Sequence, residues 1–239
     1  DLGRSRGLGD VYKRQIKYAD KPFIAAPSGL AIGGGFEVVL HCDYNVAHTN
    51  VVLGLVESLV GLIPAGGGCK EMLWRWLQTP EGKENSEHAS MKVFDLIGYA
   101  ITATSPNEAL PNQFFLEKDK VVINRDRQLS TAIDLLNNIE GGYEKPSQPK
   151  FNLGGSAVRD KMFEKLEALY NENKILDHGL EVGKQIAFVL SGGNTNIDNE
   201  LSEDDLYNLE LEAFMRLIQM PKTQERIKHT LETGKPLVN

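Results

Sequence analysis

The chain has 239 residues, 41% of them apolar, and a formal net charge of −7. This length allows one large domain or two small ones, and the acidic balance argues against nucleic acid or an anionic membrane surface as the main partner. Two cysteines, Cys42 and Cys69, cannot form a disulfide framework, and no apolar run reaches the roughly 18 residues that a membrane-spanning helix needs. We therefore expect a cytoplasmic protein without a membrane span.

The first 15 residues differ from the rest of the chain. The stretch DLGRSRGLGDVYKRQ is polar and glycine-rich, carries scattered Arg and Lys, and shows no helical or strand period. One interpretation is a basic arm. We favour a non-native leader, because the stretch resembles the translated sequencing adaptors found at the ends of reading frames. Fold prediction then begins near Ile16, and we expect the natural protein to extend upstream.

From residue 22 the pattern predicts an α/β arrangement. Pro22–Gly29 is a short apolar run bounded by turn residues, which is typical of a buried strand. FEVVLHCD, residues 36–43, carries the next element, expected to be a buried helix, and Tyr44–Ala47 and Val51–Leu55 are strand-like. A glycine-rich turn then leads into a helix that contains Met72, Leu73, Trp76 and Leu77.

Beyond residue 77 the chain is predicted to be mainly helical. The polar span Gln78–Ser90 is expected to be a surface loop, and residues 90–103 and 129–139 carry helical spacing. Between these helices, Lys120–Asn124 is predicted to be the last strand. Glu140–Ser156 is rich in Gly, Pro and Ser and is expected to be a connector.

Four helices are expected after the connector. One has an apolar face from Val158 to Tyr170, and the next runs over Asp177–Leu190. Ser202 is a predicted N-cap of a long helix, and Pro221 separates that helix from the last one. The gradient from strands to helices predicts a leader over residues 1–15, an α/β core over 16–145 and a C-terminal helical region over 146–239.

Three consecutive glycines, Gly33–Gly35, are the most unusual local feature. Each costs roughly 0.5–1 kcal/mol relative to Ala in a regular element, which a fold tolerates where something must approach the backbone. Their spacing fits neither a dinucleotide fingerprint, nor a phosphate loop, nor a nucleophile elbow. The five histidines show no metal-ligand spacing, so we predict no metal site. Taken alone, the glycines are equally compatible with a tight turn, close packing or a ligand site.

Two carboxylates give these glycines a chemical context. The unpaired N–H groups at the start of a helix can bind a carbonyl oxygen that becomes negative during a reaction, as in an oxyanion hole. Glu37 follows one turn later, and Glu57 lies among apolar residues in LGLVESLVG. Each acid also has a purely structural interpretation, since Glu37 could face solvent and Glu57 could cap a turn. Together with the glycines they favour proton transfer beside a carbonyl.

The stretches APSGLAIGGGFEVVLHCDYNVAHTN and GLVESLVGLIPAGGG resemble the signature of the crotonase (enoyl-CoA hydratase/isomerase) superfamily. The resemblance covers residues 21–76 and, more weakly, AFMRLIQMPKTQERIKHTLETGKPL. It implies a ββα spiral fold in which the Gly34 amide is one of two oxyanion donors to an acyl-CoA thioester. Glu37 would activate a water and Glu57 would protonate the α-carbon. The flanking residues implied to bind substrate are Gly33, Gly35, Gly61 and Pro64.

The same resemblance implies an enoyl-CoA hydratase of fatty-acid β-oxidation, for which acyl-CoA is the substrate and no cofactor is needed in this chain. The alternatives are an isomerase or other acyl-CoA chemistry on the same fold, and a catalytically silent assembly subunit. Val56 departs from the Pro that many members have before the second acid. The second oxyanion amide lies upstream in this family, so we expect the chain to be N-terminally truncated and inactive, or nearly so, alone.

The tail from residue 190 resembles bacterial fusion proteins in which a 3-hydroxyacyl-CoA dehydrogenase precedes the crotonase domain. NAD is therefore expected only in a missing upstream dehydrogenase part. Relatives usually form trimers, so the resemblance implies a homo-oligomer or a multienzyme.

Overall fold

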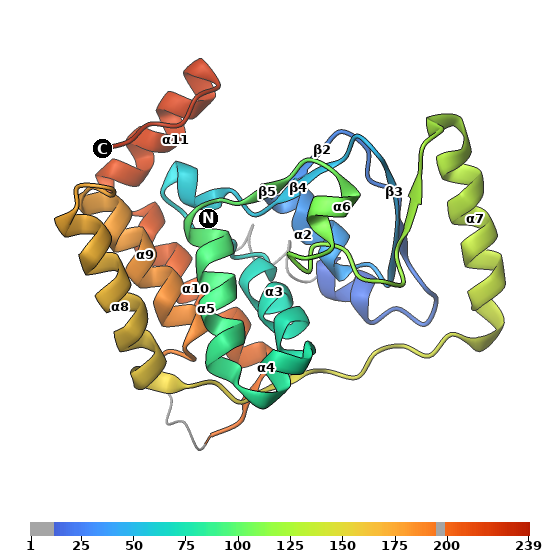
Figure 1. The fold of residues 1–239 in the computed structure, drawn as a ribbon, viewed down its shortest axis with the longest axis horizontal. Coiled ribbons are helices and arrows are strands. Elements are labelled where there is room, and N and C mark those ends of the chain that lie inside the picture. Colours follow the sequence, from blue (N-terminus) through green and yellow to red (C-terminus); the bar gives the residue numbers. More distant parts are fainter. Residues whose placement is uncertain (1–11, 195–198) are drawn as a thin grey trace. The chain divides into compact units, whose positions relative to one another are not determined.

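The computed structural model describes residues 12–194 and 199–239, which form two compact units (Figure 1). Of the described residues, the first unit comprises 12–55 and 102–148, and the second comprises 56–101, 149–194 and 199–239. Each unit is described by itself. The predicted three-part division at residues 15 and 145 stays a prediction.

Two small sheets, each of three strands, organise the first unit. One has the order β1–β3–β6 with parallel neighbours, and the other has the order β2–β4–β5, in which β2 and β4 are parallel and β5 is antiparallel. This confirms the strands predicted in the first 55 residues and at Lys120–Asn124. The bounds are β1 (Ile24–Ala25), β2 (Leu30–Ile32), β3 (Tyr44–His48), β4 (Val52–Gly54), β5 (Thr102–Ala103) and β6 (Lys120–Val122).

Helices complete the core of the first unit. In α2 (Gly34–His41), Phe36 is fully buried and meets Phe114 edge-on, with the ring centroids 5.0 Å apart. Helix α7 (Gln128–Ile139) lies beside β3 in Figure 1, and its buried face packs on Val46 of that strand. The short α6 (Pro106–Ala109) follows β5. Both predicted helices of this unit are therefore confirmed, and α2 begins inside the glycine triplet.

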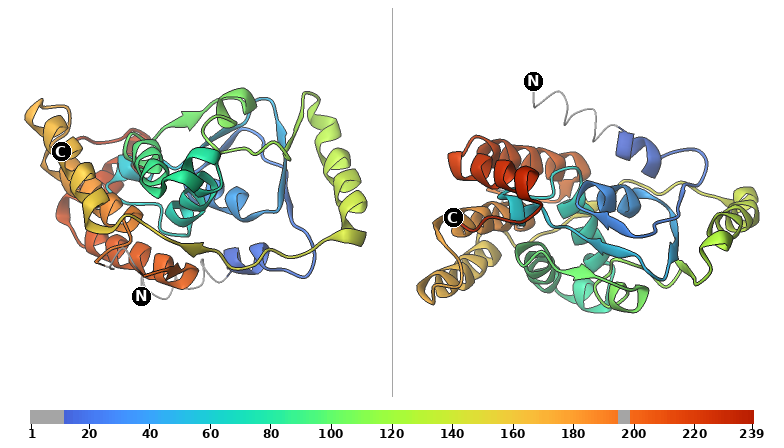
Figure 2. Two further views of the ribbon diagram at one scale, coloured as in Figure 1. Left: turned by 60° about the horizontal axis from the view of Figure 1, so that its bottom comes forward. Right: turned by 90° about the horizontal axis from the view of Figure 1, so that it is seen from above.

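Helices dominate the second unit. The pair α8–α9 lies side by side in Figures 1 and 2, and the buried side chains of α9 include Ile186 and Val189. The bounds are η1 (Glu57–Val60), α3 (Gly68–Leu77), α4 (Pro80–Glu84), α5 (Ser86–Gly98), α8 (Gly155–Asn171), α9 (Asp177–Leu190), α10 (Glu203–Ile218) and α11 (Pro221–Thr233).

Several helix boundaries agree with the sequence signals. Ser202 caps α10 in a capping box with Asp205, Pro221 is the first residue of α11, and Gly234 ends α11 with φ 69°. Helix α9 has the predicted bounds. These ends are set by local chemistry, which is why they could be predicted.

Three local predictions are wrong. The span Gln78–Ser90 is not a loop, because Thr79 and Asn85 accept hydrogen bonds from the first turns of α4 and α5. The strand at Lys120–Asn124 is not the last, since β7 (Lys150–Phe151) pairs antiparallel with β8 (Leu201–Ser202). The helix predicted over residues 90–103 ends at Gly98, because Thr102–Ala103 forms the strand β5. Residues 12–17 are helical, residues 1–11 lie outside the described residues, and the interpretation of residues 1–15 as a leader stays a prediction.

Candidate active site

The glycine triplet forms the start of α2. Gly33 adopts φ 55°, ψ −130°, a conformation that L side chains rarely take, and its N–H donates to the Gly54 carbonyl at 2.8 Å. Gly34 and Gly35 are exposed, and a Cβ on either would meet no atom within 4 Å. As the first residue of the helix, Gly34 has an N–H with no acceptor inside the helix. An exposed backbone donor therefore lies at the positive end of the helix dipole.

Glu37 lies one turn into α2 and is 4% exposed. The interpretation in which it faces solvent is therefore wrong. Its Oε2 is 2.6 Å from Nζ of Lys13, which is also largely buried. The exposed N-terminal amides of α2 and the buried Glu37 carboxylate thus belong to one short helix. Lys13 was not predicted from the sequence, because it falls in the stretch interpreted as a leader.

Glu57 is the first residue of η1 in the second unit and is half-buried. Its carbonyl accepts the N–H of Leu62 at 3.0 Å, so the acid begins a closed turn. Gly61 ends this turn with φ 78°, and a Cβ there would lie 2.8 Å from Nε2 of His178. A glycine is therefore required at position 61, because φ is positive there and because a Cβ would clash with His178. The contact predicted between Gly61 and the substrate stays a prediction.

Side chains from α9 and α11 hold this turn in place. Thr223 donates its hydroxyl proton to the Gly61 carbonyl at 3.1 Å, and Nε2 of His178 is 2.8 Å from the same hydroxyl oxygen. Since Thr223 has one proton to donate, His178 must donate from Nε2, and in the neutral imidazole Nδ1 then carries no proton. Arg226 also donates to the Ser58 carbonyl at 3.4 Å. The segment that carries Glu57 is thus fixed by residues more than 100 positions away.

We expect the stability of the protein to fall as the pH drops below about 6.5. Burial and the neighbouring Arg226 and Lys222 lower the pKa of His178, while Glu181 and Glu225 oppose this effect. The unfolded chain therefore binds more protons than the folded one between the folded pKa and the unfolded value near 6.5. His178→Gln, which can still donate to Thr223, should show a smaller loss of unfolding free energy between pH 7 and pH 5. An equal loss in both proteins would contradict this assignment.

Pro64, the remaining candidate, and His41 are both buried and both take part in hydrogen bonds with the protein backbone. Pro64 is buried at the start of the turn before α3, and its carbonyl accepts the N–H of Cys69. His41 is buried, with Nδ1 2.6 Å from the Glu37 carbonyl. Within the described residues, no group of three or more His, Cys, Asp or Glu could hold a metal ion, and no helix is long and apolar enough to cross a bilayer.

The candidate residues Gly33–Gly35, Glu37 and Glu57 lie in a segment that matches a known protein family. The family model described as enoyl-CoA hydratase/isomerase matches residues 6–84, which include the glycine triplet and both acids. Residues 6–84 are a crotonase-superfamily segment. The crystal structure of a carnitinyl-CoA hydratase from Mycobacterium avium matches with a TM-score of 0.54 and 19% identity, over 93% of this chain and 64% of that one. The crotonase-like α/β fold, mostly helical here, is thereby confirmed.

Longer relatives match almost the whole of this chain. A Bacillus subtilis protein named "Probable 3-hydroxyacyl-CoA dehydrogenase" is 34% identical over 226 residues, which are 94% of this chain. A Rickettsia felis protein named "Putative fatty acid oxidation complex trifunctional enzyme" is 29% identical over 95% of this chain. The chain spans 28% of the length of each of these relatives.

Proposed function

We propose that the protein containing this chain is an enoyl-CoA hydratase of fatty-acid oxidation, which adds water to a trans-2-enoyl-CoA. The observation that carries the proposal is the start of α2, where the exposed Gly34 amide and the buried Glu37 carboxylate lie within one helical turn. The names of the longer relatives support the setting in fatty-acid oxidation and a neighbouring 3-hydroxyacyl-CoA dehydrogenase part, which would bind the NAD.

The proposed reaction uses these groups as follows. Glu37 takes a proton from a water, whose oxygen bonds to the β-carbon while the C=C electron pair moves onto the thioester oxygen. The Gly34 N–H stabilises that negative oxygen, which is where preorganised donors have their largest effect. The enolate then collapses, and its α-carbon takes a proton from Glu57. Return of one proton from Glu37 to Glu57 through solvent restores both acids, and the net change is the addition of one water.

The test is hydration of crotonyl-CoA by the intact protein and by the variants Glu37→Gln and Glu57→Gln. Loss of hydration in both variants supports the hydratase. Loss of turnover only in Glu57→Gln supports an isomerase, because isomerases of the family keep only the second acid. Unchanged behaviour of both variants supports a catalytically silent assembly subunit.

We further propose a cytoplasmic homo-oligomer or multienzyme. Four exposed apolar side chains lie on or next to β6 and α7, and burying them against another copy would remove apolar surface from water. The four are Val121, Ile123, Leu129 and Ile133, exposed by 47%, 83%, 69% and 49%.

A further inference from the structure

The turn that carries Glu57 is the short 3₁₀ helix η1. It is closed by the N–H groups of Gly61 and Leu62, which donate to the carbonyls of residues 58 and 57 at 3.1 Å and 3.0 Å. On one side, the Ser58 hydroxyl donates to the Ile97 carbonyl of α5 at 2.9 Å. Hydrogen bonds in a 3₁₀ helix have poorer geometry than those in an α-helix, so the direction of η1 depends on such contacts from outside. Any change in that direction moves the Glu57 carboxylate.

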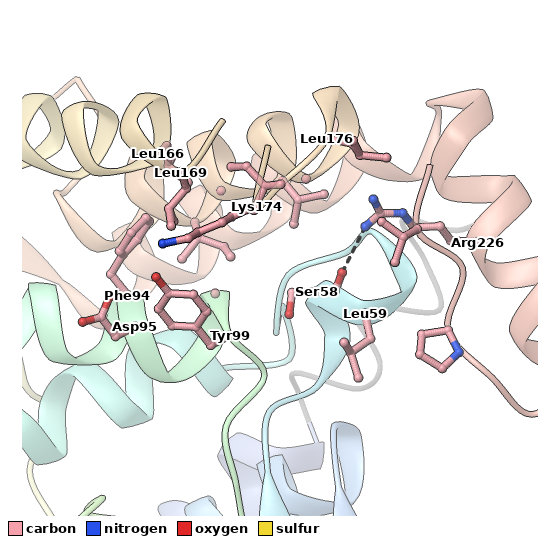
Figure 3. A pocket seen from close by; sticks show the side chains of 18 of the residues that line it. Ser58, Leu59, Phe94, Asp95, Tyr99, Leu166, Leu169, Lys174, Leu176 and Arg226 are labelled. Atoms are coloured by element: carbon pink, nitrogen blue, oxygen red, sulfur yellow. Dashed lines mark hydrogen bonds between the residues drawn. The ribbon is translucent and has the colours of Figure 1, made fainter. Parts of the chain in front are cut away.

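Helix α11 provides two donors to this turn. Thr223 and Arg226 lie three positions apart, which places both side chains on one face of α11. Thr223 donates to the Gly61 carbonyl at 3.1 Å, and Arg226 donates to the Ser58 carbonyl at 3.4 Å (Figure 3). Thr223 is fully buried and Arg226 is 6% exposed. The two side chains therefore hold η1 just after its first residue and at its end.

The last residues of the chain hold one of these donors. Residues 234–239, here called the strap, return along α11 after the glycine that ends it (Figure 1). The side-chain oxygen of Asn239 accepts from Nε of Arg226 at 2.8 Å. The amide of the same side chain donates to the Lys222 carbonyl at 3.2 Å and to the Glu225 carboxylate at 3.1 Å. The strap thus orients the guanidinium that donates to η1.

The hydrogen bonds between α11 and η1 lie where water is largely excluded. Burial lowers the pKa of Arg226, since its cation loses hydration in the folded protein. A buried donor or acceptor that loses its partner is more costly than one at the surface. We therefore expect η1 and α11 to keep one arrangement, with the carboxylate on η1 held in one place.

We propose that Thr223 and Arg226 are positioning residues for Glu57, and that the strap keeps Arg226 in place through Asn239. Displacement of a reacting group by about 1 Å can lower a rate by about 100-fold, so the support of η1 acts on the chemical step. The proposal rests on the proposed function, because it takes Glu57 as the acid that protonates the α-carbon.

The first test is steady-state hydration of crotonyl-CoA by the intact protein and by its variants Thr223→Val and Thr223→Ser. Valine has the shape of threonine without the hydroxyl, whereas serine keeps the hydroxyl. We expect kcat to fall by about 10–100-fold in Thr223→Val, with KM within about twofold of the parent, and to recover in Thr223→Ser. A purely structural role predicts a lower melting temperature of Thr223→Val with unchanged kcat. That result, or a raised KM at unchanged kcat, overturns the proposal.

The second test addresses the strap with Asn239→Ala, at a half-buried position outside the helices. Asn208→Ala, at an exposed position of α10, is the matched control. The amides of Gly61 and Leu62 report on η1, because both close it. We expect hydrogen exchange at these amides to be about tenfold faster in Asn239→Ala, as for the loss of roughly one hydrogen bond, and unchanged in Asn208→Ala.

The two measurements separate this proposal from the proposed function. Hydrogen exchange needs no substrate, so equal exchange in the parent and in Asn239→Ala overturns the role of the strap in every case. A parent that does not hydrate crotonyl-CoA contradicts the proposed function, and the assignment of Thr223 and Arg226 to catalysis falls with it. A parent that hydrates crotonyl-CoA and keeps its kcat in Thr223→Val contradicts the positioning role alone.

Discussion

In the intact protein, Glu37→Gln is expected to lower kcat for crotonyl-CoA hydration by about 10²–10⁴-fold, the usual contribution of general acid–base catalysis. Glutamine keeps the size and the hydrogen-bonding shape of the side chain and cannot accept a proton from water. Because Glu37 is 4% exposed inside α2, the substitution changes the charge without changing an exposed surface. Steady-state hydration kinetics of the parent and the variant give the ratio.

The control is Lys13→Met, which removes the cation 2.6 Å from Glu37 and leaves the carboxylate. If Glu37 acts as the base, Lys13→Met keeps most of the hydration that Glu37→Gln loses. If the ion pair matters only for structure, both variants lose hydration together and both melt at lower temperature. Equal kcat in Glu37→Gln and the parent would exclude Glu37 as the base.

Lys70→Met is expected to lower the free energy of unfolding by about 3–5 kcal/mol, the cost of removing one partner from a buried ion pair. Lys70 is fully buried in α3, with Nζ 2.5 Å from Oε1 of Glu203 and in a shorter contact with Glu71. Nζ also lies 4.7 Å from the centre of the Tyr207 ring. The variant leaves two buried carboxylates without their shared cation. Chemical denaturation at pH 7 measures the loss.

The matched control is Lys161→Met, since the Lys161–Glu87 pair is largely exposed and such pairs contribute about 0–1 kcal/mol. The double variant Lys70→Met/Glu203→Gln should recover part of the loss, because it removes one of the unpaired charges. A loss for Lys70→Met no larger than that for Lys161→Met would contradict the account.

The pKa of Lys70 determines how its contribution to the free energy of unfolding depends on pH. Burial lowers the pKa of Lys70, but Glu71, Tyr207 and Glu203 outweigh it and raise the pKa above its usual value of 10.5. A raised lysine pKa stabilises the folded state fully below 10.5, and this stability is lost only as the pH rises toward the folded value. The contribution is therefore present in full at neutral pH.

Features with a local cause could be predicted from the sequence. The capping box at Ser202, the proline at the start of α11 and the helix inside the glycine triplet all follow from short-range backbone chemistry. The same holds for the candidate Gly34 and Glu37, which share one helix. The prediction of a loop over residues 78–90 is wrong because two of its polar residues, Thr79 and Asn85, are the N-caps of α4 and α5. A polar stretch can therefore still form helices.

Features that join distant segments could not be predicted. The Glu210 carboxylate of α10 accepts the N–H groups of Gly67 and Lys70, both at 2.8 Å, and so caps α3 from 140 positions away. Glu203, Tyr207 and Glu210 recur at helical spacing, which indicates a shared face and does not reveal Lys70 as its partner. Likewise, nothing near Gly61 in the sequence indicates His178 or Thr223. Tertiary packing decides these pairings.

The central claim is that the Gly34 N–H binds the thioester oxygen. The most direct measurement is the infrared carbonyl stretch of carbonyl-¹³C butanoyl-CoA, a saturated thioester, bound to the parent, Gly34→Ala and Gly34→Pro. Proline is favoured at the first position of a helix and removes only this donor, while alanine keeps the N–H and has open space for its Cβ. The account predicts a lowered stretch frequency in the parent and in Gly34→Ala, and a smaller shift in Gly34→Pro. A shift of equal size in all three proteins would contradict it.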